Sequence, residues 1–255
     1  MSGAVGVQQS DPSIGGSAGG RPPGVNTAAP VTTTHLLVRY AKRGKMRFAS
    51  HLDVARAFER GVRRAGLPIA YSAGFTPHPK ISYAGGAPTG VASEAEYLSL
   101  ALTSRIEADV AREQLNAALP DGIDVIVVTE DAGGLPASRL TASEWHVALP
   151  GLKPGDAAGV VQKFLALAEA PVERLTSKGM RRMDARSAVV SLEVHDEAAG
   201  DAVLRMILRH TVPSVRPDDV LNALRDVSDV IPSALPLITR LTQGSLGESG
   251  LVVAL

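Results

Sequence analysis

The order of the expected secondary structure elements is the feature of this sequence that most narrows its fold. Short runs rich in Val, Ile and Leu predict strands, and apolar residues at helical spacing predict helices. From His35 onward these patterns follow the order strand–helix–strand–strand–helix–strand, and a similar order begins again after Thr141. This order is typical of the ferredoxin-like unit, in which helices cover one face of an antiparallel sheet. We therefore predict an α+β fold with two tandem ferredoxin-like (βαββαβ) domains; one larger α+β domain is the alternative.

The composition along the chain indicates the domain boundaries. Residues 1–33 are rich in Gly, Ser, Pro, Ala and Thr, so they bury too little apolar surface to offset the entropy of ordering, and we expect a disordered tail. The two domains are expected at residues 34–131 and 143–255, joined by a linker at residues 132–142. The expected strands are 35–40, 69–71, 80–83, 96–102, 123–129, 144–149, 172–177, 188–195, 202–210, 237–241 and 251–255, and the expected helices are 51–65, 105–119, 155–168 and 217–227.

Residue types that are absent exclude several kinds of site. The chain has no cysteine, which excludes disulfides, thiolate zinc sites, a cysteine nucleophile and a Cys-ligated iron–sulfur cluster. We expect no cofactor in this chain and a reducing compartment. No apolar run reaches the roughly 18–20 residues that span a bilayer, and the first residues lack the pattern of a signal peptide. We therefore expect a cytoplasmic protein without a membrane partner.

Basic residues gather in two segments, although the formal net charge of the chain is zero. The first segment, residues 39–64, has nine Lys and Arg but only two carboxylates. On the expected helix, four arginines occupy one side, namely Arg56, Arg60, Arg63 and Arg64. The second segment, in a stretch expected to be a turn between strands, holds Lys178, Arg181 and Arg182. Such side chains can contact RNA phosphates and gain affinity by releasing counterions; the alternative is a solvated surface that pairs in part with the acidic segment 94–131.

The loop before residue 81 has an unusual composition. Two prolines bracket His78; each fixes its own φ, and Pro79 also favours an extended conformation of His78. Gly74 permits a backbone bend, and Phe75 is placed to anchor the loop in the core. A rigid loop that presents a histidine and a lysine indicates a binding site, with a scaffold role as the alternative. The predicted recognition loop consists of Gly74, Phe75, Pro77, His78, Pro79 and Lys80.

The start of the first helix holds a second group of polar residues. Ser50 is expected to cap this helix and Asp53 to complement its dipole, which leaves His51 as a surface residue. If the recognition loop folds over the helix start, His51 and His78 converge and could act in acid–base chemistry, with Lys80 stabilising charge on a phosphate. These three residues are the catalytic candidates. No spacing typical of zinc ligands is present, so we expect no metal site.

Several stretches resemble a known family. In order along the chain they are Lys45-Met-Arg-Phe-Ala-Ser-His-Leu-Asp53, Phe58-Glu-Arg60, Arg63-Arg-Ala-Gly-Leu-Pro68, Gly74-Phe-Thr-Pro-His-Pro-Lys-Ile-Ser82 and Gly90-Val-Ala-Ser-Glu-Ala-Glu96. They resemble the radical-SAM-associated family of unknown function, whose domain stands alone or is joined to the C-terminal side of a cobalamin-binding radical SAM protein. The resemblance covers about residues 35–240 and is densest at residues 45–96.

The resemblance implies a partner. A radical SAM enzyme needs a Cys-ligated cluster, so the radical chemistry has to lie in another protein. Relatives are often encoded near a ribonuclease of the E/G type, which favours RNA as a ligand. We therefore expect a non-catalytic accessory or substrate-binding protein that acts with a radical SAM protein and binds RNA, and that is not an enzyme by itself. The alternatives are a metal-independent RNA-processing endonuclease, with His51 or His78 as general base, and an adaptor that binds only protein.

Overall fold

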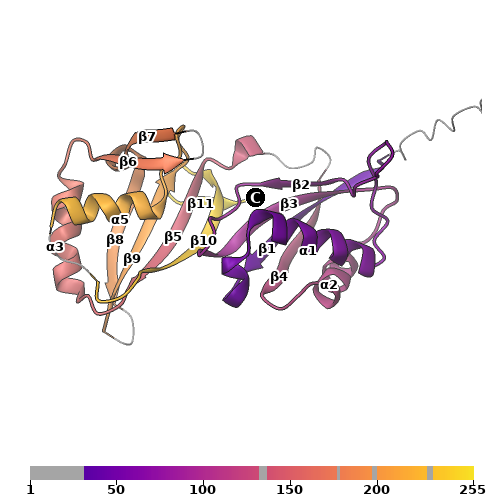
Figure 1. Cartoon of the computed structure of the whole chain (residues 1–255), viewed down its shortest axis with the longest axis horizontal. Helices are drawn as coiled ribbons and strands as arrows, with labels where there is room; N and C mark the ends of the chain where they lie inside the picture. Colours follow the sequence, from indigo (N-terminus) through magenta and orange to yellow (C-terminus); the bar gives the residue numbers. More distant parts are fainter. Residues whose placement is uncertain (1–31, 132–136, 177–178, 197–199, 229–231) are drawn as a thin grey trace, which may run out of the picture.

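The computed structural model describes residues 32–131, 137–176, 179–196, 200–228 and 232–255. Most of the expected tail, the first part of the expected linker and Lys178 lie outside the described residues. The mixed α+β class is confirmed, since helices pack on one large sheet that runs through the whole molecule (Figure 1).

The first half of the chain forms one end of this sheet. Its elements are β1 (Thr34–Lys42), the 3-10 helix η1 (Gly44–Phe48), α1 (His51–Arg64), β2 (Ile81–Ala84), β3 (Ala92–Leu102), α2 (Ala108–Ala118) and β4 (Ile123–Asp131). The strands lie in the order β4-β1-β3-β2, and every neighbouring pair is antiparallel. Both helices cover the same face, and their apolar sides pack with the sheet into one core around Phe58 and Leu115.

The second half repeats this order with an insertion. Its elements are η2 (Ala137–Arg139), β5 (Ala142–Leu149), α3 (Pro154–Leu165), β6 (Pro171–Thr176), β7 (Gly179–Asp184), α4 (Ala185–Ala188), β8 (Val189–Asp196), β9 (Ala202–Arg209), α5 (Pro217–Asp226), β10 (Leu237–Leu246) and β11 (Val252–Ala254). The strands β10-β5-β9-β8 are antiparallel neighbours, and a second core lies around Phe164 and Met206. The inserted hairpin β6–β7 forms its own two-stranded sheet and packs on α5.

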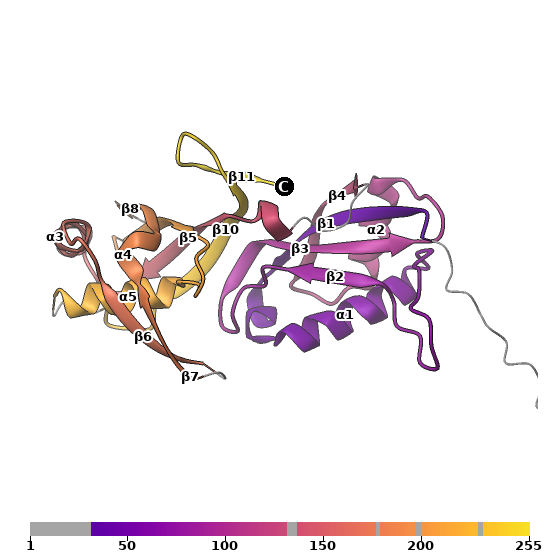
Figure 2. The ribbon, with the colours of Figure 1, turned by 90° about the horizontal axis from the view of Figure 1, so that it is seen from above.

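The two halves share one sheet because β3 and β10 pair. The strand β3 is long enough to pair β2 near one end and β10 at the other, where Thr239 lies opposite Ala92 and Arg240 opposite Ser93. This contact is parallel, unlike the others in the large sheet. It joins strands that are far apart in the sequence and creates the junction at the middle of the molecule (Figure 2).

Local sequence signals explain α1. The Ser50 hydroxyl accepts a hydrogen bond from the Asp53 N–H (3.2 Å), and the Asp53 carboxylate accepts one from the Ser50 N–H (3.1 Å). This capping box confirms the predicted start of the helix. The buried side of α1 carries Val54, Phe58 and Val62 at helical spacing.

Two sequence predictions are wrong. The stretch from residue 178 to 186 was expected to be a turn, but Gly179–Asp184 is strand β7, because it pairs along its whole length with β6 and buries Met183 in the second core. Residues 69–71 were expected to form a strand, but Ile69 and Tyr71 make only isolated bridges, to Leu102 and Pro79. Both outcomes depend on partners outside the local sequence.

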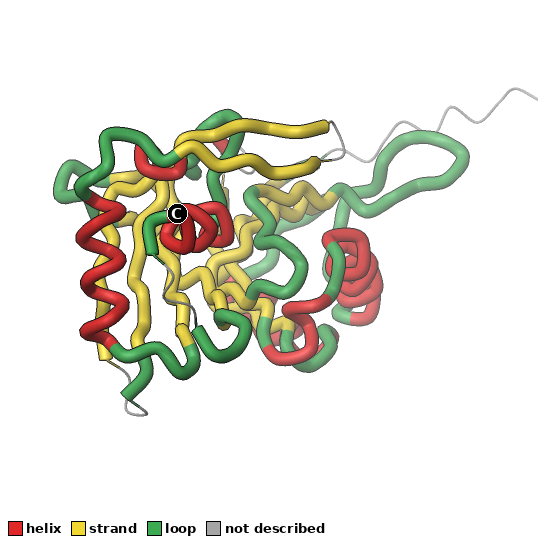
Figure 3. Tube along the Cα trace, turned by 60° about the vertical axis from the view of Figure 1, so that its left-hand side comes forward, coloured by secondary structure: helices red, strands yellow, loops and turns green. Residues whose placement is uncertain are grey.

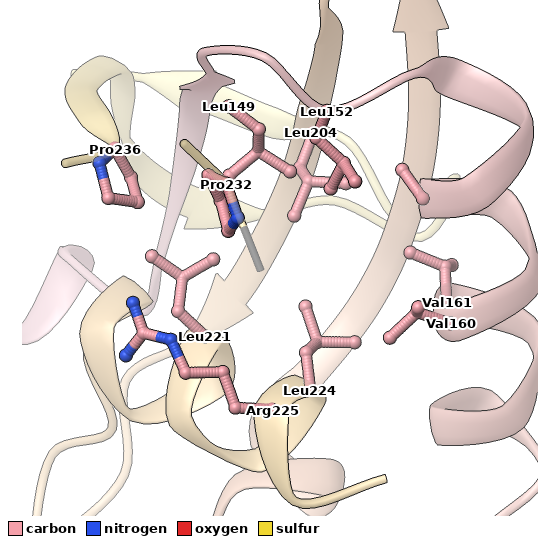
Figure 4. A pocket seen from close by; sticks show the side chains of 11 residues that line it. Leu149, Leu152, Val160, Val161, Leu204, Leu221, Leu224, Arg225, Pro232 and Pro236 are labelled. Carbon is pink, nitrogen blue, oxygen red and sulfur yellow. The ribbon is translucent and has the colours of Figure 1, made fainter. Parts of the chain in front are cut away.

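The second core contains a small apolar cavity of about 30 Å³ between α3, α5 and the sheet. Leucine, valine and proline side chains line it, and Arg225 is the charged residue at its edge (Figure 4). The Arg225 guanidinium donates a hydrogen bond to the side chain of Asn222 (2.8 Å), on its own helix. Over the described residues, no helix is long and apolar enough to cross a membrane.

Candidate functional site

Five polar side chains are buried together where β3 meets β10. We call them the junction cluster; they are Lys42, Ser93, Glu96, Arg240 and Gln243. The Arg240 guanidinium lies at the centre and donates hydrogen bonds to the Ser93 hydroxyl (3.2 Å), to the side-chain oxygen of Gln243 and to the Glu96 carboxylate. Buried polar groups are unfavourable unless they are paired, so the pairing within this cluster depends on the assembly of β1, β3 and β10.

A loop of small residues covers the junction cluster. Lys42 donates from Nζ to the carbonyl oxygens of Ala87 (3.2 Å) and Pro88 (3.4 Å), and the Ala87 N–H donates to the Glu96 carboxylate (3.1 Å). Burial lowers the pKa of Lys42, and the charge of Glu96 opposes that shift. The loop is therefore held to the sheet by one basic and one acidic side chain of the cluster.

Two hollows open on either side of this loop. The His51 hollow, of about 230 Å³, is lined by Tyr40, Lys42, His51, Val54, Gly86, Ala87 and Glu96. The Trp145 hollow, of about 290 Å³, is lined by Gly85, Gly86, Pro88, Trp145, Leu208, His210, Ser214, Val215, Arg216, Arg240 and Gln243. Arg240 and Trp145 lie opposite each other on β10 and β5, and Trp145 belongs to the core under α3 and α5. The Trp145 hollow therefore lies on the helix side of the sheet.

The Trp145 hollow has an aromatic and polar wall. The Arg240 guanidinium lies 5.5 Å from the centroid of the Trp145 ring. His210 uses both ring nitrogens: Nδ1 lies 2.7 Å from the Leu140 carbonyl oxygen, and Nε2 lies 2.7 Å from the Ser143 hydroxyl. A carbonyl oxygen only accepts, so Nδ1 carries the proton and the neutral ring fits this arrangement. Burial lowers the pKa of His210, which favours the neutral form further.

The structure does not bring His51 and His78 together. His51 packs edge-on against Tyr83, with ring centroids 5.2 Å apart, and lines the His51 hollow. His78 and Lys80 line another hollow, of about 640 Å³, together with His35 and Ser99. Because His35 and Ser99 alternate with the core residues of their strands, this hollow lies on the sheet face opposite the helices. The three catalytic candidates thus do not form one acid–base group.

The recognition loop projects from the end of the first half that is far from the junction (Figure 3). The bend at Gly74 has the expected positive φ of 128°, and Ser72 and His78 exchange hydrogen bonds across the loop. The expectation that Phe75 anchors the loop in the core is wrong, because its side chain is fully exposed. Pro79 is the buried residue of the predicted set, and its bridge to Tyr71 holds the base of the loop instead.

The predicted basic residues of α1 and of the hairpin β6–β7 lie on the helix side of the sheet. The four arginines of α1 are exposed, and Arg64 donates from Nη1 to the Ala118 carbonyl oxygen (3.1 Å) at the end of α2. Arg181 and Arg182 are exposed on β7. The hairpin β6–β7 packs on α5, so it lies on the same side as α1 (Figure 2). Within the described residues, no ion pair involves Arg60 or Arg63, and no group of three or more metal-ligating side chains occurs.

One family model matches most of the chain. The family model described as "Uncharacterized protein conserved in bacteria (DUF2344)" matches residues 35–217, which is most of the folded chain. The chain belongs to this family. The search of curated proteins returned no match.

A solved structure of a Cbf5–Nop10–Gar1 complex contains a chain that is similar to this DUF2344 chain with a TM-score of 0.45 and 11% identity. The alignment covers 86% of the DUF2344 chain and 52% of the other chain, so the DUF2344 chain spans about half the length of the chain it matches. This degree of similarity indicates neither ligand nor activity.

Sequence reasoning missed most of the junction cluster in the DUF2344 chain. Glu96 ends the last stretch of the family resemblance, and Trp145 is the single tryptophan, so each carried some signal. Nothing in the spacing of Arg240 or Gln243 points to a site. They reach Glu96 only because β10 lies beside β3, across 144 residues of sequence.

Proposed function

We propose that this DUF2344 chain is a non-catalytic accessory protein that binds RNA and acts with a radical SAM enzyme. The observation that carries the proposal is the position of the two basic segments: α1 and the hairpin β6–β7, far apart in sequence, both face the helix side of the sheet. Arg60, Arg63, Arg181 and Arg182 are exposed there. A phosphate backbone laid across this side could contact both segments.

Among the described residues, Arg60, Arg63, Arg181 and Arg182 take part in no ion pair, so their charge is available for a ligand. Arg43, by contrast, is already paired with Glu94 and Asp124, and Arg205 with Glu144. Each phosphate contact by a free arginine releases counterions, so binding should weaken steeply as salt increases. His78 and Lys80 lie on the other side of the sheet, so we leave them out of the RNA surface.

We also infer that the two halves are tandem ferredoxin-like domains. Support comes from the order βαββαβ in residues 34–131 and, with the hairpin inserted, in residues 142–246. In each half the first strand lies between the fourth and the third, and all neighbours within the half are antiparallel. Such a pair forms one broad surface of helices on which a long ligand can lie.

The proposal is tested by charge reversal. Labelled RNA extracted from the source cells is titrated with the protein at several salt concentrations. Arg60→Glu combined with Arg63→Glu should weaken binding by about tenfold or more and lower the salt dependence, because two phosphate contacts are lost. Arg209→Glu, at an exposed position on the face of β9 opposite its core residues Leu204, Met206 and Leu208, is the control and should bind as the wild type does. Equal affinity of the folded double variant and the wild type would reject the RNA surface.

The partner is tested separately. A radical SAM protein should co-purify with the tagged chain, and nuclease treatment distinguishes how it is held. Loss of the partner after nuclease treatment supports a complex bridged by RNA. A complex that survives both nuclease and high salt, from a chain that binds no RNA, supports the protein-only adaptor instead.

A further inference from the structure

Two residues that line the Trp145 hollow each have a buried N–H group with no acceptor among the described residues. The side chain of Gln243 is 0% exposed and Trp145 is 6% exposed, yet Trp145 Nε1 and Gln243 Nε2 have no hydrogen-bond partner among the described residues. Both side chains line the same hollow. Buried donors are nearly always paired in native proteins, so two of them in one hollow indicate a ligand that supplies acceptors.

The hydrogen bonds of the junction cluster fix which end of Gln243 faces the ligand. A guanidinium only donates, so the amide atom that contacts Arg240 has to be the oxygen Oε1. The NH₂ group of Gln243 is therefore the end of the amide that is left without a partner in the cluster. Trp145 Nε1 is likewise only a donor, and Arg240 has five N–H groups, of which three make the bonds to Ser93, Gln243 and Glu96. The polar atoms offered to a ligand are thus mainly donors.

Charge favours an anion in the same place. The junction cluster has two basic side chains, Lys42 and Arg240, and one carboxylate, Glu96, which already binds Arg240. Arg216 is exposed at the rim of the hollow. An oxyanion would accept hydrogen bonds from the free donors and balance the excess of basic groups.

We propose that the Trp145 hollow binds a small molecule through a phosphate or carboxylate group. The oxyanion contacts Trp145 Nε1 and Gln243 Nε2, and the body of the molecule lies against Leu208, Val215 and Pro88, the apolar part of the wall. The volume, about 290 Å³, lies at the small end of the range for ligand pockets, roughly 300–1,000 Å³. This site goes beyond the RNA surface, because it uses none of the arginines of α1 or the hairpin.

Trp145 provides a direct measurement, because it is the only tryptophan of the chain. In a two-dimensional ¹H–¹⁵N NMR spectrum of the labelled full chain, its indole N–H gives a single peak. We would titrate separately with inorganic phosphate, acetate and adenosine monophosphate, replacing chloride to keep the ionic strength constant. A saturable movement of the indole peak with at least one of them is expected. Movement with phosphate or acetate names the oxyanion, and tighter binding of the nucleotide than of phosphate shows that the body of the ligand also contributes.

A matched pair of variants tests the assignment. Gln243→Glu keeps the shape and the contact with Arg240 but replaces the donor by a second acceptor, so it should weaken binding by about tenfold or more. Gln162→Glu makes the same change at an exposed position of α3 and should leave binding unchanged. If Gln243→Glu does not fold, Arg216→Gln, an exposed change at the rim, should weaken binding instead.

Two results overturn the proposal: no saturable movement of the indole peak with any of the three probes, or unchanged affinity in the folded Gln243→Glu variant. Neither depends on the RNA titration, since Arg60 and Arg63 are intact in these proteins. Failure of one proposal therefore leaves the other standing.

Discussion

Arg240 on β10 and Glu96 on β3 form a buried ion pair that joins the two halves of the molecule across 144 residues of sequence. The side chains are only 4% and 5% exposed, respectively. Removing one partner of such a pair leaves an uncompensated buried charge, whereas a pair at the surface loses little when it is broken. This pair therefore makes the stability of the junction depend on both halves at once.

Glu96→Gln should lower the free energy of unfolding by about 3–5 kcal/mol, because Arg240 and Lys42 then lack a buried counter-charge. Urea denaturation of the full chain measures this change. Glu130→Gln breaks the exposed pair between Arg105 and Glu130 and is the matched control, for which a much smaller change is expected. Similar losses in the two variants would mean that the buried pair stabilises the protein no more than the exposed pair does.

Ser50→Ala should destabilise the protein by about 1 kcal/mol, because the N–H of Asp53 loses its acceptor at the start of α1. Denaturation against the wild type provides the measurement. Ser104→Ala, at an exposed serine outside the helices and strands, serves as the control. If Ser104→Ala destabilises the protein as much as Ser50→Ala does, loss of the helix cap does not explain the effect.

Gly85→Ala should cost more than Gly66→Ala, although both glycines have a left-handed φ, 60° and 68°. At Gly66 an added Cβ meets nothing within 4 Å, so only the backbone strain of about 1–2 kcal/mol is expected. At Gly85 the Cβ would lie 2.5 Å from Nε2 of Gln243, a buried side chain that Arg240 holds in place. Comparison of the two unfolding free energies isolates the crowding, and equal losses would show that Gln243 moves aside freely.

Features set by local sequence were predicted correctly. The capping box of α1 depends on residues three apart, and the class of the fold follows from the order of elements along the chain. The strand ends differ by a few residues; β10 was expected at 237–241 but runs to Leu246, because β5 pairs with it as far as Gly244 and β11 folds back to pair with Gly244–Leu246. Pairing of this kind is not encoded in the strand's own residues.

Features set by distant contacts were missed. Strand β7 was expected to be a turn, since its exposed positions carry basic residues and only the cross-strand pairing with β6 makes it extended. Phe75 was expected in the core, but the isolated bridge between Tyr71 and Pro79 closes the loop before the side chain can reach it. The junction cluster forms only because β3 pairs with β10, and no pattern in the sequence predicts this pairing.

The pH dependence of stability should show the effect of protonating His210. Partial burial lowers its pKa in the folded protein and the charge of Arg240 adds to the shift, whereas the hydrogen bond with the Leu140 carbonyl oxygen opposes it. The unfolded chain keeps a value of about 6.5. At pH values below the unfolded pKa, the unfolded state therefore binds more protons than the folded state. The contribution of His210 to stability falls as the pH decreases from the unfolded pKa towards the lower pKa of the folded protein. Asn at this position can keep the donor to the Leu140 carbonyl oxygen but does not titrate. The free energy of unfolding of the wild type minus that of His210→Asn should accordingly be larger at about pH 8 than at about pH 5. A difference that stays constant over this range would contradict a neutral, partly buried His210 ring in the Trp145 hollow.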